Sequence, residues 1–300
     1  MSSIFKKIWK DPYYIPYLLM KSFARHISDE HFVRWKYRLK IHKPLRLDNP
    51  ETFNEKLQWL KLNRQHPEYS QLVDKYEVKK IVRDLIGEQY IIPTLALYNS
   101  VDEIDFAKLP QRFVLKCTHN SGGNVICKDK EKLDMAKARK KLKRGLRNNP
   151  FWVNREYPYK NVRPRIIAEK YMEQEGEESL IDYKVLTFNG KAKLIVVHLD
   201  RYTDHHTQAF YDVEWNKTTI SQNKCTKMSD DVMPRPEALD EMIRLSELIT
   251  KDMIECRVDW YLIDGHLFFG ELTFFDGSGL IVFDDPNDDM MLGDWIHIPH

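Results

Sequence analysis

The sequence predicts an α+β protein in which a helical segment precedes antiparallel or mixed sheets. Residues 181–199 alternate apolar and polar side chains on both sides of an Asn-Gly pair. Residues 256–275 do the same around an Asp-Gly pair, and both dipeptides are typical of two-residue β-hairpin turns. Residues 1–72 instead place aromatic and apolar side chains at helical spacing, with prolines that close the segments.

Length and composition exclude several classes of protein. With 300 residues, the chain can bury a sizeable core and is expected to divide into two or three lobes. Its 47 Lys and Arg residues nearly balance 45 Asp and Glu, which argues against nucleic acid as a main partner. The apolar stretches are far shorter than the ~20 residues of a membrane-spanning helix. Four cysteines without a C-x-x-C motif, and no signal peptide, predict a cytoplasmic protein without structural zinc.

The first 27 residues mix basic and aromatic side chains, and two interpretations of this mixture are open. The segment can lie on a membrane surface, since basic residues such as Lys6 alternate with aromatic residues such as Trp9. It can also form a pair of helices packed on the main body. Pro12 and Pro16 are expected to break a long interfacial helix, which favours the second interpretation.

The helices that follow have recognisable ends. Asn49 or Thr52 can cap the helix that begins within NPETFNEKLQWLKL, and Glu55 lies three residues after Thr52. A second helix is expected over residues 74–87, with Gly87 as its stop. Its predicted inward face carries four apolar residues: Val78, Ile81, Val82 and Leu85.

Strands and helices alternate further along the chain. A short extended segment, YIIPTLALYNS, is broken by Pro93. Residues 134–149 are expected to form a basic helix with its charges in solvent. Residues 165–173 read as a strand, and residues 236–253 as an amphipathic helix.

A glycine loop follows the apolar strand RFVLKCTH. The strand carries Lys116 near its end, and Ser121, Gly122 and Gly123 follow it. Paired glycines let several backbone N–H groups approach a phosphate, and the lysine adds a positive charge beside them. The same residues also fit an ordinary hairpin turn with a lysine at the edge of a sheet. This segment alone leaves both interpretations open.

The last hairpin carries two acidic residues that can face the same way. Alternation places Arg257 and Asp259 on one face of the outgoing strand, and Glu271 and Thr273 on one face of the returning strand. Depending on the register, Asp259 lies roughly opposite Glu271. Two such carboxylates repel unless a cation lies between them, and oxygen ligands suit Mg²⁺, which also binds phosphate. The alternative is a salt bridge to Arg257 at the edge of the sheet.

Several longer stretches together resemble one known family. They are NPETFNEKLQWLKL, LVDKYEVKKIV, LPQRFVLKCTHNSGGNVICKDK, RIIAEKYM, DYKVLTFNGK, FYDVEWN, RVDWYLIDGHLFFGELTFFDGSG and LGDWI, and they span nearly the whole chain after residue 40. The sequence resembles the ATP-grasp superfamily, and within it the TupA-like proteins of teichuronopeptide biosynthesis. The resemblance implies an ATP-grasp fold, in which two α+β lobes hold ATP between them.

The resemblance also implies a division of the chain. Residues 1–72 correspond to a mostly helical N-terminal extension, and residues 73–300 to the ATP-grasp domain. Within that domain, a small nucleotide-covering lobe is expected over about 111–171 and a metal-binding lobe over about 172–300.

The nucleotide-binding residues of the family are matched at several positions. Lys116 resembles the lysine that reaches the ATP phosphates, and Lys75 resembles the earlier lysine on the linker side. Ser121, Gly122 and Gly123 resemble the mobile loop that folds over the triphosphate, so the resemblance favours a phosphate loop over an ordinary turn.

The remaining matches concern the base, the metal and the transferred phosphate. Asp182 and Lys184 resemble an acidic-x-basic motif that faces the nucleotide, and Arg257 resembles the arginine that steadies the transferred phosphate. The hinge strand that lines the adenine pocket is matched by Glu169, Lys170, Tyr171 and Met172. The magnesium ligands are matched by Asp259 and Glu271, with Thr273 where an asparagine is usual.

The resemblance implies ATP and Mg²⁺ as cofactors and an ATP-dependent carboxylate–amine ligase as the function. The expected reaction proceeds through an acylphosphate and amidates a uronic acid, or adds amino acids, in surface polysaccharide biosynthesis. The expected partners are therefore a sugar acid or polysaccharide precursor and an amino acid or other amine, with contact to a membrane or a biosynthetic complex through the N-terminal region.

Three alternative functions remain open. A glycosyltransferase of capsule or lipopolysaccharide synthesis would be expected to carry an Asp-x-Asp motif, which the sequence lacks. The others are an ATP-grasp kinase without ligation and a scaffold without catalysis. His205 and His206 either contact substrate or lie in a polar loop.

Overall fold

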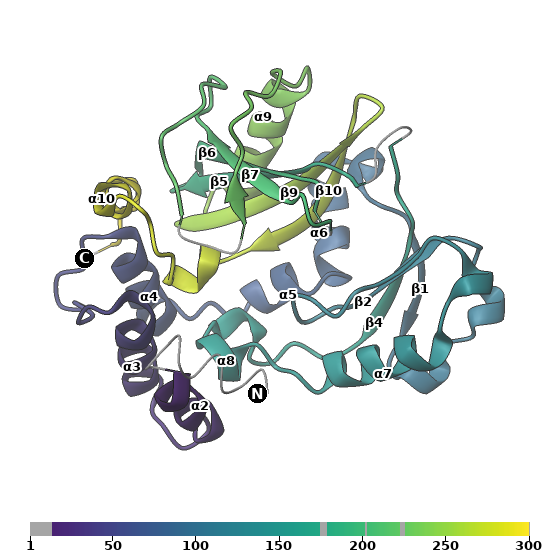
Figure 1. Ribbon diagram of the computed structural model, residues 1–300, viewed down its shortest axis with the longest axis horizontal. Coiled ribbons are helices and arrows are strands. Elements are labelled where there is room, and N and C mark those ends of the chain that lie inside the picture. Colours follow the sequence, from purple (N-terminus) through teal and green to yellow (C-terminus); the bar gives the residue numbers. More distant parts are fainter. Residues whose placement is uncertain (1–13, 175–178, 202, 223–225, 300) are drawn as a thin grey trace.

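The computed structural model describes residues 14–174, 179–201, 203–222 and 226–299. Two sheets form the body of the protein, and the N-terminal helices stack at one end of its long axis (Figure 1). Lys6, Trp9 and Pro12 of the basic and aromatic N-terminal segment lie outside the described residues, as does Cys225. The other cysteines are buried and form no disulfide. The predicted α+β class is confirmed.

Helices make up the chain before the first described strand, as predicted. They are α2 (Tyr14–Ser22), α3 (Asp29–Ile41), α4 (Phe53–Asn63), α5 (Tyr69–Val73) and α6 (Glu77–Ile86). The Thr52 side chain accepts a hydrogen bond from the Glu55 backbone and the Glu55 side chain accepts one from the Thr52 backbone, which is the expected capping box. Pro16 does not break α2. It is the third residue of that helix, where a backbone N–H has no intrahelical partner to lose.

Two buried cations hold α2 and α3 against the main body. The Arg155 side chain donates to the Ile27 carbonyl at 3.2 Å, pairs with Asp29 at 2.6 Å and packs over a phenylalanine ring of α3. Arg155 follows α8 (Phe151–Asn154), and Lys36 of α3 donates to the Val153 carbonyl of that helix at 2.6 Å. The helical pair is therefore a fixed part of the structure.

The inward face of α6 differs from the prediction. Val78 and Val82 are buried as expected, but Ile81 and Leu85 are exposed. Lys79 is buried instead and donates to the Ile92 carbonyl at 2.8 Å. A tertiary partner for the lysine thus overrides the apolar periodicity.

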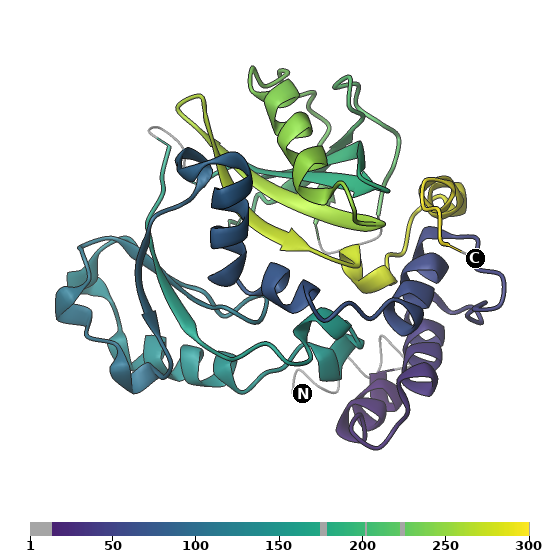
Figure 2. The same ribbon diagram turned by 180° about the vertical axis from the view of Figure 1, so that it is seen from behind.

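The smaller sheet has four antiparallel strands. In spatial order they are β1 (Thr94–Tyr98), β4 (Ile166–Lys170), β2 (Phe113–Cys117) and β3 (Val125–Cys127). The β2–β3 hairpin is the one predicted around the glycine loop. The basic helix α7 (Met135–Leu146) lies below this sheet in Figures 1 and 2, and it contributes Ala138 and Leu142 to the small core.

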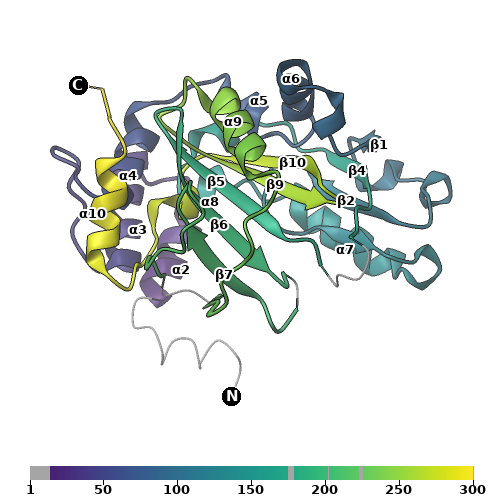
Figure 3. The same ribbon diagram turned by 90° about the horizontal axis from the view of Figure 1, so that it is seen from above.

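The larger sheet has six strands, of which the last pair is parallel. In spatial order they are β10 (His266–Thr273), β9 (Glu255–Ile263), β5 (Asp182–Phe188), β6 (Lys191–Leu199), β7 (Thr207–Tyr211) and β8 (Lys227–Met228). Asn189 and Gly190 join β5 to β6, and Asp264 and Gly265 join β9 to β10, all four with positive φ. Both predicted hairpins are confirmed. The amphipathic helix α9 (Leu239–Thr250) covers one face of this sheet (Figure 3).

The C-terminal segment returns to the N-terminal helices. Helix α10 (Pro286–Asp294) packs on α4, and a Cβ added at Gly293 would lie 2.8 Å from the Phe53 nitrogen. The Asn54 amide donates to the Ile281 carbonyl, and the Ile281 N–H donates back to Asn54, both at 2.8 Å. None of the helices in the described ranges combines the length and the apolar character needed to cross a membrane.

Candidate functional site

A cavity of about 600 Å³ lies between the two sheets. Residues of β2, β3, β4, β5 and β9 and of the loops around them share in its wall. They are Ile92, Val114, Lys116, Asn124, Ile126, Lys128, Glu169, Lys170, Tyr171, Met172, Ser179, Leu180, Asp182, Arg201, Thr203 and Tyr261. Six residues predicted to bind the nucleotide therefore border one space: Lys116, Glu169, Lys170, Tyr171, Met172 and Asp182.

One wall of the cavity carries a buried carboxylate between two lysines. The Nζ atom of Lys116 lies 2.7 Å from a Glu169 oxygen, and Lys79 pairs with the other oxygen. Glu169 sits in β4 opposite Val114 of β2, which fixes its position beside Lys116. The two lysines lower the pKa of Glu169 to about 2 despite its burial. A positive charge is thereby held at the cavity wall.

The glycine loop lies at the rim. Gly122 and Gly123 have φ of 84° and 74°, and neither would bring a Cβ within 4 Å of another atom. Of this loop, Asn124 borders the cavity, while Ser121 and the two glycines do not. The phosphate role assigned to the loop therefore remains a prediction.

Asp182 and Lys184 lie side by side on β5, and both are buried. One Asp182 oxygen pairs with Arg201, and the same oxygen lies 3.7 Å from the Lys184 Nζ atom. Its other oxygen, Oδ1, is buried without a hydrogen-bond partner among the described residues. An unsatisfied carboxylate oxygen at a cavity wall suits a hydroxyl donor from a ligand. Lys184 also pairs with Asp259, which lies directly opposite it on β9.

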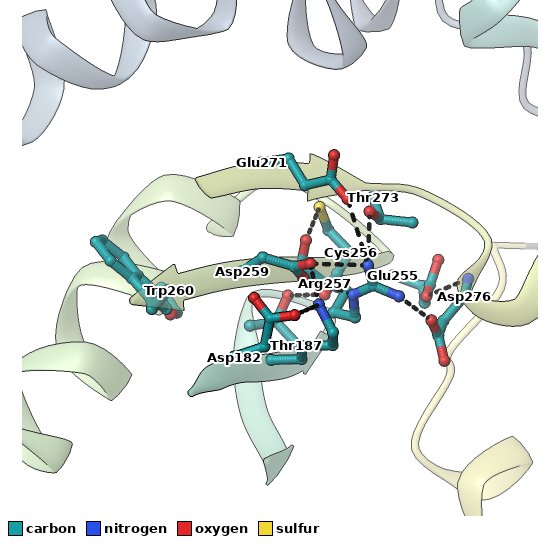
Figure 4. Close-up of polar contacts among 12 residues, drawn as sticks. Asp182, Thr187, Glu255, Cys256, Arg257, Asp259, Trp260, Glu271, Thr273 and Asp276 are labelled. Atoms are coloured by element: carbon teal, nitrogen blue, oxygen red, sulfur yellow. Dashed lines mark hydrogen bonds and ion pairs between the residues drawn. The ribbon is translucent and has the colours of Figure 1, made fainter. Parts of the chain in front are cut away.

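The acidic residues of the last hairpin meet as predicted. Asp259 of β9 is the register partner of Glu271 of β10, and a bulge at Gly270 precedes the pair. A Cβ at Gly270 would lie 3.1 Å from the Asp259 carbonyl oxygen, so glycine permits this close approach. Figure 4 shows both carboxylates turned toward the Arg257 guanidinium.

Arg257 is the centre of this cluster. It contacts Asp259 at 2.6 and 2.9 Å, donates to the Thr273 hydroxyl at 3.1 Å and lies 3.7 Å from Glu271. It also donates to Asp276 at 2.5 Å. The surrounding carboxylates raise the pKa of Arg257 further, while burial alone would lower it. The salt bridge to Arg257 and the facing pair of carboxylates therefore occur together.

A second cation reaches Glu271 from the linker between α5 and α6. The Lys75 Nζ atom lies 2.7 Å from a Glu271 oxygen. Its backbone N–H donates to the Thr118 carbonyl at 3.0 Å, which ties the linker to the end of β2. Although burial raises the pKa of Glu271, Lys75 and Arg257 together hold it well below its usual range. Glu271 is thus an ionised carboxylate.

The residues fit a magnesium ion as a pair of oxygen ligands. Asp259 and Glu271 supply carboxylate oxygens on one face of the hairpin, and Mg²⁺ commonly takes one or two carboxylates together with phosphate oxygens. The Thr273 hydroxyl accepts from Arg257, so it is engaged elsewhere. Across the described ranges, no group of three or more His, Cys, Asp or Glu side chains forms a ready metal site.

Several charged residues around the site were not identified from the sequence. Lys79 lies in a helix whose apolar residues suggested a different inward face, and the residues next to it in the sequence do not indicate that it is buried against a carboxylate. Asp276 lies in the FFDGSG turn, and no local pattern in the sequence indicates that its carboxylate contacts Arg257. Asp74 pairs with Arg165 at 2.9 Å and positions the linker that carries Lys75.

His205 and His206 lie in the segment before β7, and contact of either residue with substrate stays a prediction. His206 lies 2.9 Å from His198 of β6, ring nitrogen to ring nitrogen, while His205 is in an exposed turn. Burial and the nearby Lys184 and Arg201 charges lower the pKa of His198 to about 3. These histidines do not border the cavity.

Comparisons with known proteins give fold-level and family-level matches. The D-alanine–D-alanine ligase of Bacillus anthracis, solved with ATP, is 18% identical with a TM-score of 0.41, and the match covers 68% of this chain and 55% of that one. The Helicobacter pylori D-alanine–D-alanine ligase is 15% identical with a TM-score of 0.40, over 83% and 70%. The D-cycloserine synthetase DcsG is 12% identical with a TM-score of 0.43, over 91% and 80%.

The family assignment rests on the sequence itself. No curated protein matches the chain. The chain spans little more than half the length of the Bacillus anthracis ligase that it resembles. The family profile described as TupA-like ATPgrasp matches residues 55–297, which is most of the chain and includes both sheets. The protein therefore belongs to the TupA-like ATP-grasp family and has an ATP-grasp fold.

Proposed function

We propose that the protein is an ATP-dependent carboxylate–amine ligase that acts through an acylphosphate. The observation that carries this proposal is the grouping of a lysine, a hinge strand and an unsatisfied carboxylate oxygen around one cavity, next to the acidic hairpin. Membership of the ATP-grasp family supports the use of ATP.

The cavity wall offers suitable contacts for a nucleoside. Ile92, Val114 and Met172 supply apolar surface for the base, next to the backbone of the hinge at Lys170. The free oxygen of Asp182 suits a ribose hydroxyl, which would satisfy a buried acceptor.

The cations of the site suit the phosphates. Lys116, Lys75, Lys184 and Arg257 each pair with a carboxylate, and each is close enough to the acidic hairpin or the cavity to exchange that carboxylate for a phosphate oxygen. Asp259 and Glu271 would hold Mg²⁺, which neutralises phosphate charge when bound. Charge neutralisation and fixed positioning are the main contributions that a protein makes to phosphoryl transfer.

The proposed reaction has two steps, phosphorylation of the acceptor carboxylate and displacement of phosphate by the amine. A carboxylate oxygen of the acceptor attacks the γ-phosphorus, the bond to the bridging oxygen of ADP breaks, and an acylphosphate forms. The amine then attacks the acyl carbon, the bond between that carbon and the phosphate oxygen breaks, and the amine loses a proton. Lys184 and Arg257 are expected to steady the negative oxygens in both steps.

The proposed substrates are a uronic acid or a related sugar acid and an amino acid or other amine, in the synthesis of a surface polysaccharide. We place this work in the cytoplasm, at the inner face of the membrane where such precursors are built. Both points come from the family resemblance, and the reaction type does not depend on them.

The test is an ATPase assay with pooled uronic acids and pooled amino acids, read by mass spectrometry for the amide. We expect ADP and phosphate only when a carboxylate is present, and full turnover only when the amine is added as well. A phosphorylated product without an amine requirement would identify a kinase instead. Transfer of sugar from an activated donor without ATP cleavage would identify a glycosyltransferase.

A further inference from the structure

An apolar groove of about 480 Å³ runs between α2 and α3. These helices lie at the end of the molecule opposite β1 (Figures 1 and 3). Its most exposed apolar side chains are Leu19, Phe23 and Trp35, which are 56%, 58% and 55% exposed. Leu19 is on α2 and Phe23 directly follows that helix. The Phe23 N–H donates to the Leu19 carbonyl at 3.1 Å, so the helical turn continues and the two side chains lie on one face. Three large apolar side chains left in solvent on adjacent helices indicate a contact surface.

Basic side chains are exposed on the helical pair that forms the groove, and Arg38 lines the groove itself. Lys21 and Arg25 on and after α2, and Arg38 and Lys40 on α3, are exposed, and within the described part of the chain none of them forms an ion pair with a carboxylate. The segment from 14 to 43 has two acidic residues, and both are engaged. Asp29 pairs with Arg155 at 2.6 Å, and Glu30 pairs with Arg34 at 2.8 Å. These four basic side chains, the basic rim, therefore give the helical pair uncompensated positive charge.

The buried contacts of the helical pair hold the groove in place on the main body. Lys36 is anchored to α8, and Lys61, Lys40 and Lys21 add to its burial in lowering its pKa to about 7. Because Arg155 and Lys36 fix the helices to the main body, the groove is a rigid surface rather than an isolated helix.

We propose that this groove and its basic rim dock on a lipid bilayer that contains anionic lipid. Leu19, Phe23 and Trp35 would enter the boundary between headgroups and acyl chains, and the lysines and arginines would contact lipid phosphates. The inference deepens the proposed function, because it names the surface that would bring the active site to membrane-bound precursors.

Charge selects the bilayer over the two other occupants. A second copy docked through the same surface would place two positive rims against each other, which is unfavourable. Residues 1–13 contain three lysines and one aspartate, so this segment also repeats the charge of the rim. A negatively charged bilayer surface complements both the apolar floor and the rim.

The test is sedimentation with vesicles at low salt. Vesicles of phosphatidylglycerol mixed with phosphatidylcholine are expected to bind the full chain, and phosphatidylcholine vesicles to bind it far more weakly. Each basic side chain near an anionic surface contributes about a five-fold gain in binding, so Lys21→Glu with Arg38→Glu should lower the partition coefficient by at least about 25-fold. Leu19→Ser with Phe23→Ser should also abolish sedimentation.

Matched controls carry the same chemical changes elsewhere. Lys108→Glu with Lys193→Glu reverses two exposed charges, and Val232→Ser with Leu85→Ser removes two exposed apolar side chains. These variants should bind vesicles as the unaltered protein does. Every variant is also checked for ATP affinity by calorimetry, which is independent of vesicle binding and separates a failure of docking from a failure of the proposed ligase.

Three results would overturn the proposal. One is equal binding by the charge-reversed variant and its control. Another is a dimer in light scattering that Phe23→Ser dissociates, combined with no sedimentation, since a second copy would then occupy the groove. The last is vesicle binding by a chain that lacks residues 1–13 but not by the full chain, since that segment would then cover the groove.

Discussion

Replacing Glu169 by glutamine removes the carboxylate that two buried lysines share. Glu169 is 4% exposed, Lys116 lies 2.7 Å from one of its oxygens, and Lys79 pairs with the other. The side chain keeps its size in Glu169→Gln, so the substitution removes the charge and little of the packing. Both lysines then remain at the cavity wall without their counter-charge.

The expected loss follows from the pKa of the carboxyl group. Folding lowers this pKa from 4.5 to about 2, and one pKa unit corresponds to about 1.4 kcal/mol, which gives about 3 kcal/mol. Burial lowers the pKa of Lys79 more than Glu169 raises it. Burying the charged lysine therefore offsets part of the stabilisation that the ion pair gives. We therefore expect a loss of about 2–3 kcal/mol at pH 7.

The pH dependence has a definite sign. Because the folded pKa is the lower one, the stabilisation is complete above the unfolded value of 4.5 and is lost as the pH falls toward about 2. Urea unfolding of both proteins at pH 7 and pH 3.5 measures this. The difference in free energy of unfolding should shrink by about 1.4 kcal/mol at the lower pH.

The control is Glu173→Gln, the same change in an exposed pair with Arg112 near the end of the same strand. Such a pair is worth less than about 1 kcal/mol, so this variant should be almost as stable as the unaltered protein. An equal effect of the two substitutions at pH 7, or a Glu169→Gln effect that does not change with pH, would refute the reasoning.

Three further predictions follow from the site and the fold. Lys116→Ala should weaken ATP binding about ten- to 150-fold in calorimetry, since a charge-assisted contact is worth about 1.5–3 kcal/mol, and unchanged affinity would remove this lysine from the site. Asp259→Asn and Glu271→Gln should each abolish product formation while keeping much of the nucleotide affinity, and near-normal turnover at saturating magnesium would make the acidic hairpin structural. Gly293→Ala should cost about 1–3 kcal/mol in urea unfolding, because its Cβ would lie 2.8 Å from the Phe53 nitrogen, and an unchanged midpoint would contradict the close packing of α10.

Local chemistry explains why the hairpins could be predicted. Asn189-Gly190 and Asp264-Gly265 adopt positive φ at both positions, which few other dipeptides do without strain. Once the second turn is set, alternation and register bring Asp259 and Glu271 together. Both the turn residues and the strand alternation are local signals, because each depends only on residues that are close together in the sequence.

The partners of the buried charges could not be predicted in the same way. Lys79 and Glu169 are 90 positions apart in the numbering and meet only because β4 lies beside the linker from α6. Helical periodicity favoured Ile81 and Leu85 for the inward face, and the free energy of pairing a buried lysine decided against them. Arg155 likewise joins α8 to α3, and no local sequence pattern indicates this contact.

The central claim is that a carboxylate of the acceptor attacks the γ-phosphorus of ATP, and an oxygen label tests it most directly. ¹⁸O is placed in the acceptor carboxylate, the reaction is run with ATP and the amine, and the released phosphate is analysed by mass spectrometry. The carboxylate oxygen that attacks phosphorus leaves with the phosphate when the amine displaces it, so one ¹⁸O atom should appear in each phosphate. Unlabelled phosphate from a reaction that does form the amide would contradict the acylphosphate mechanism.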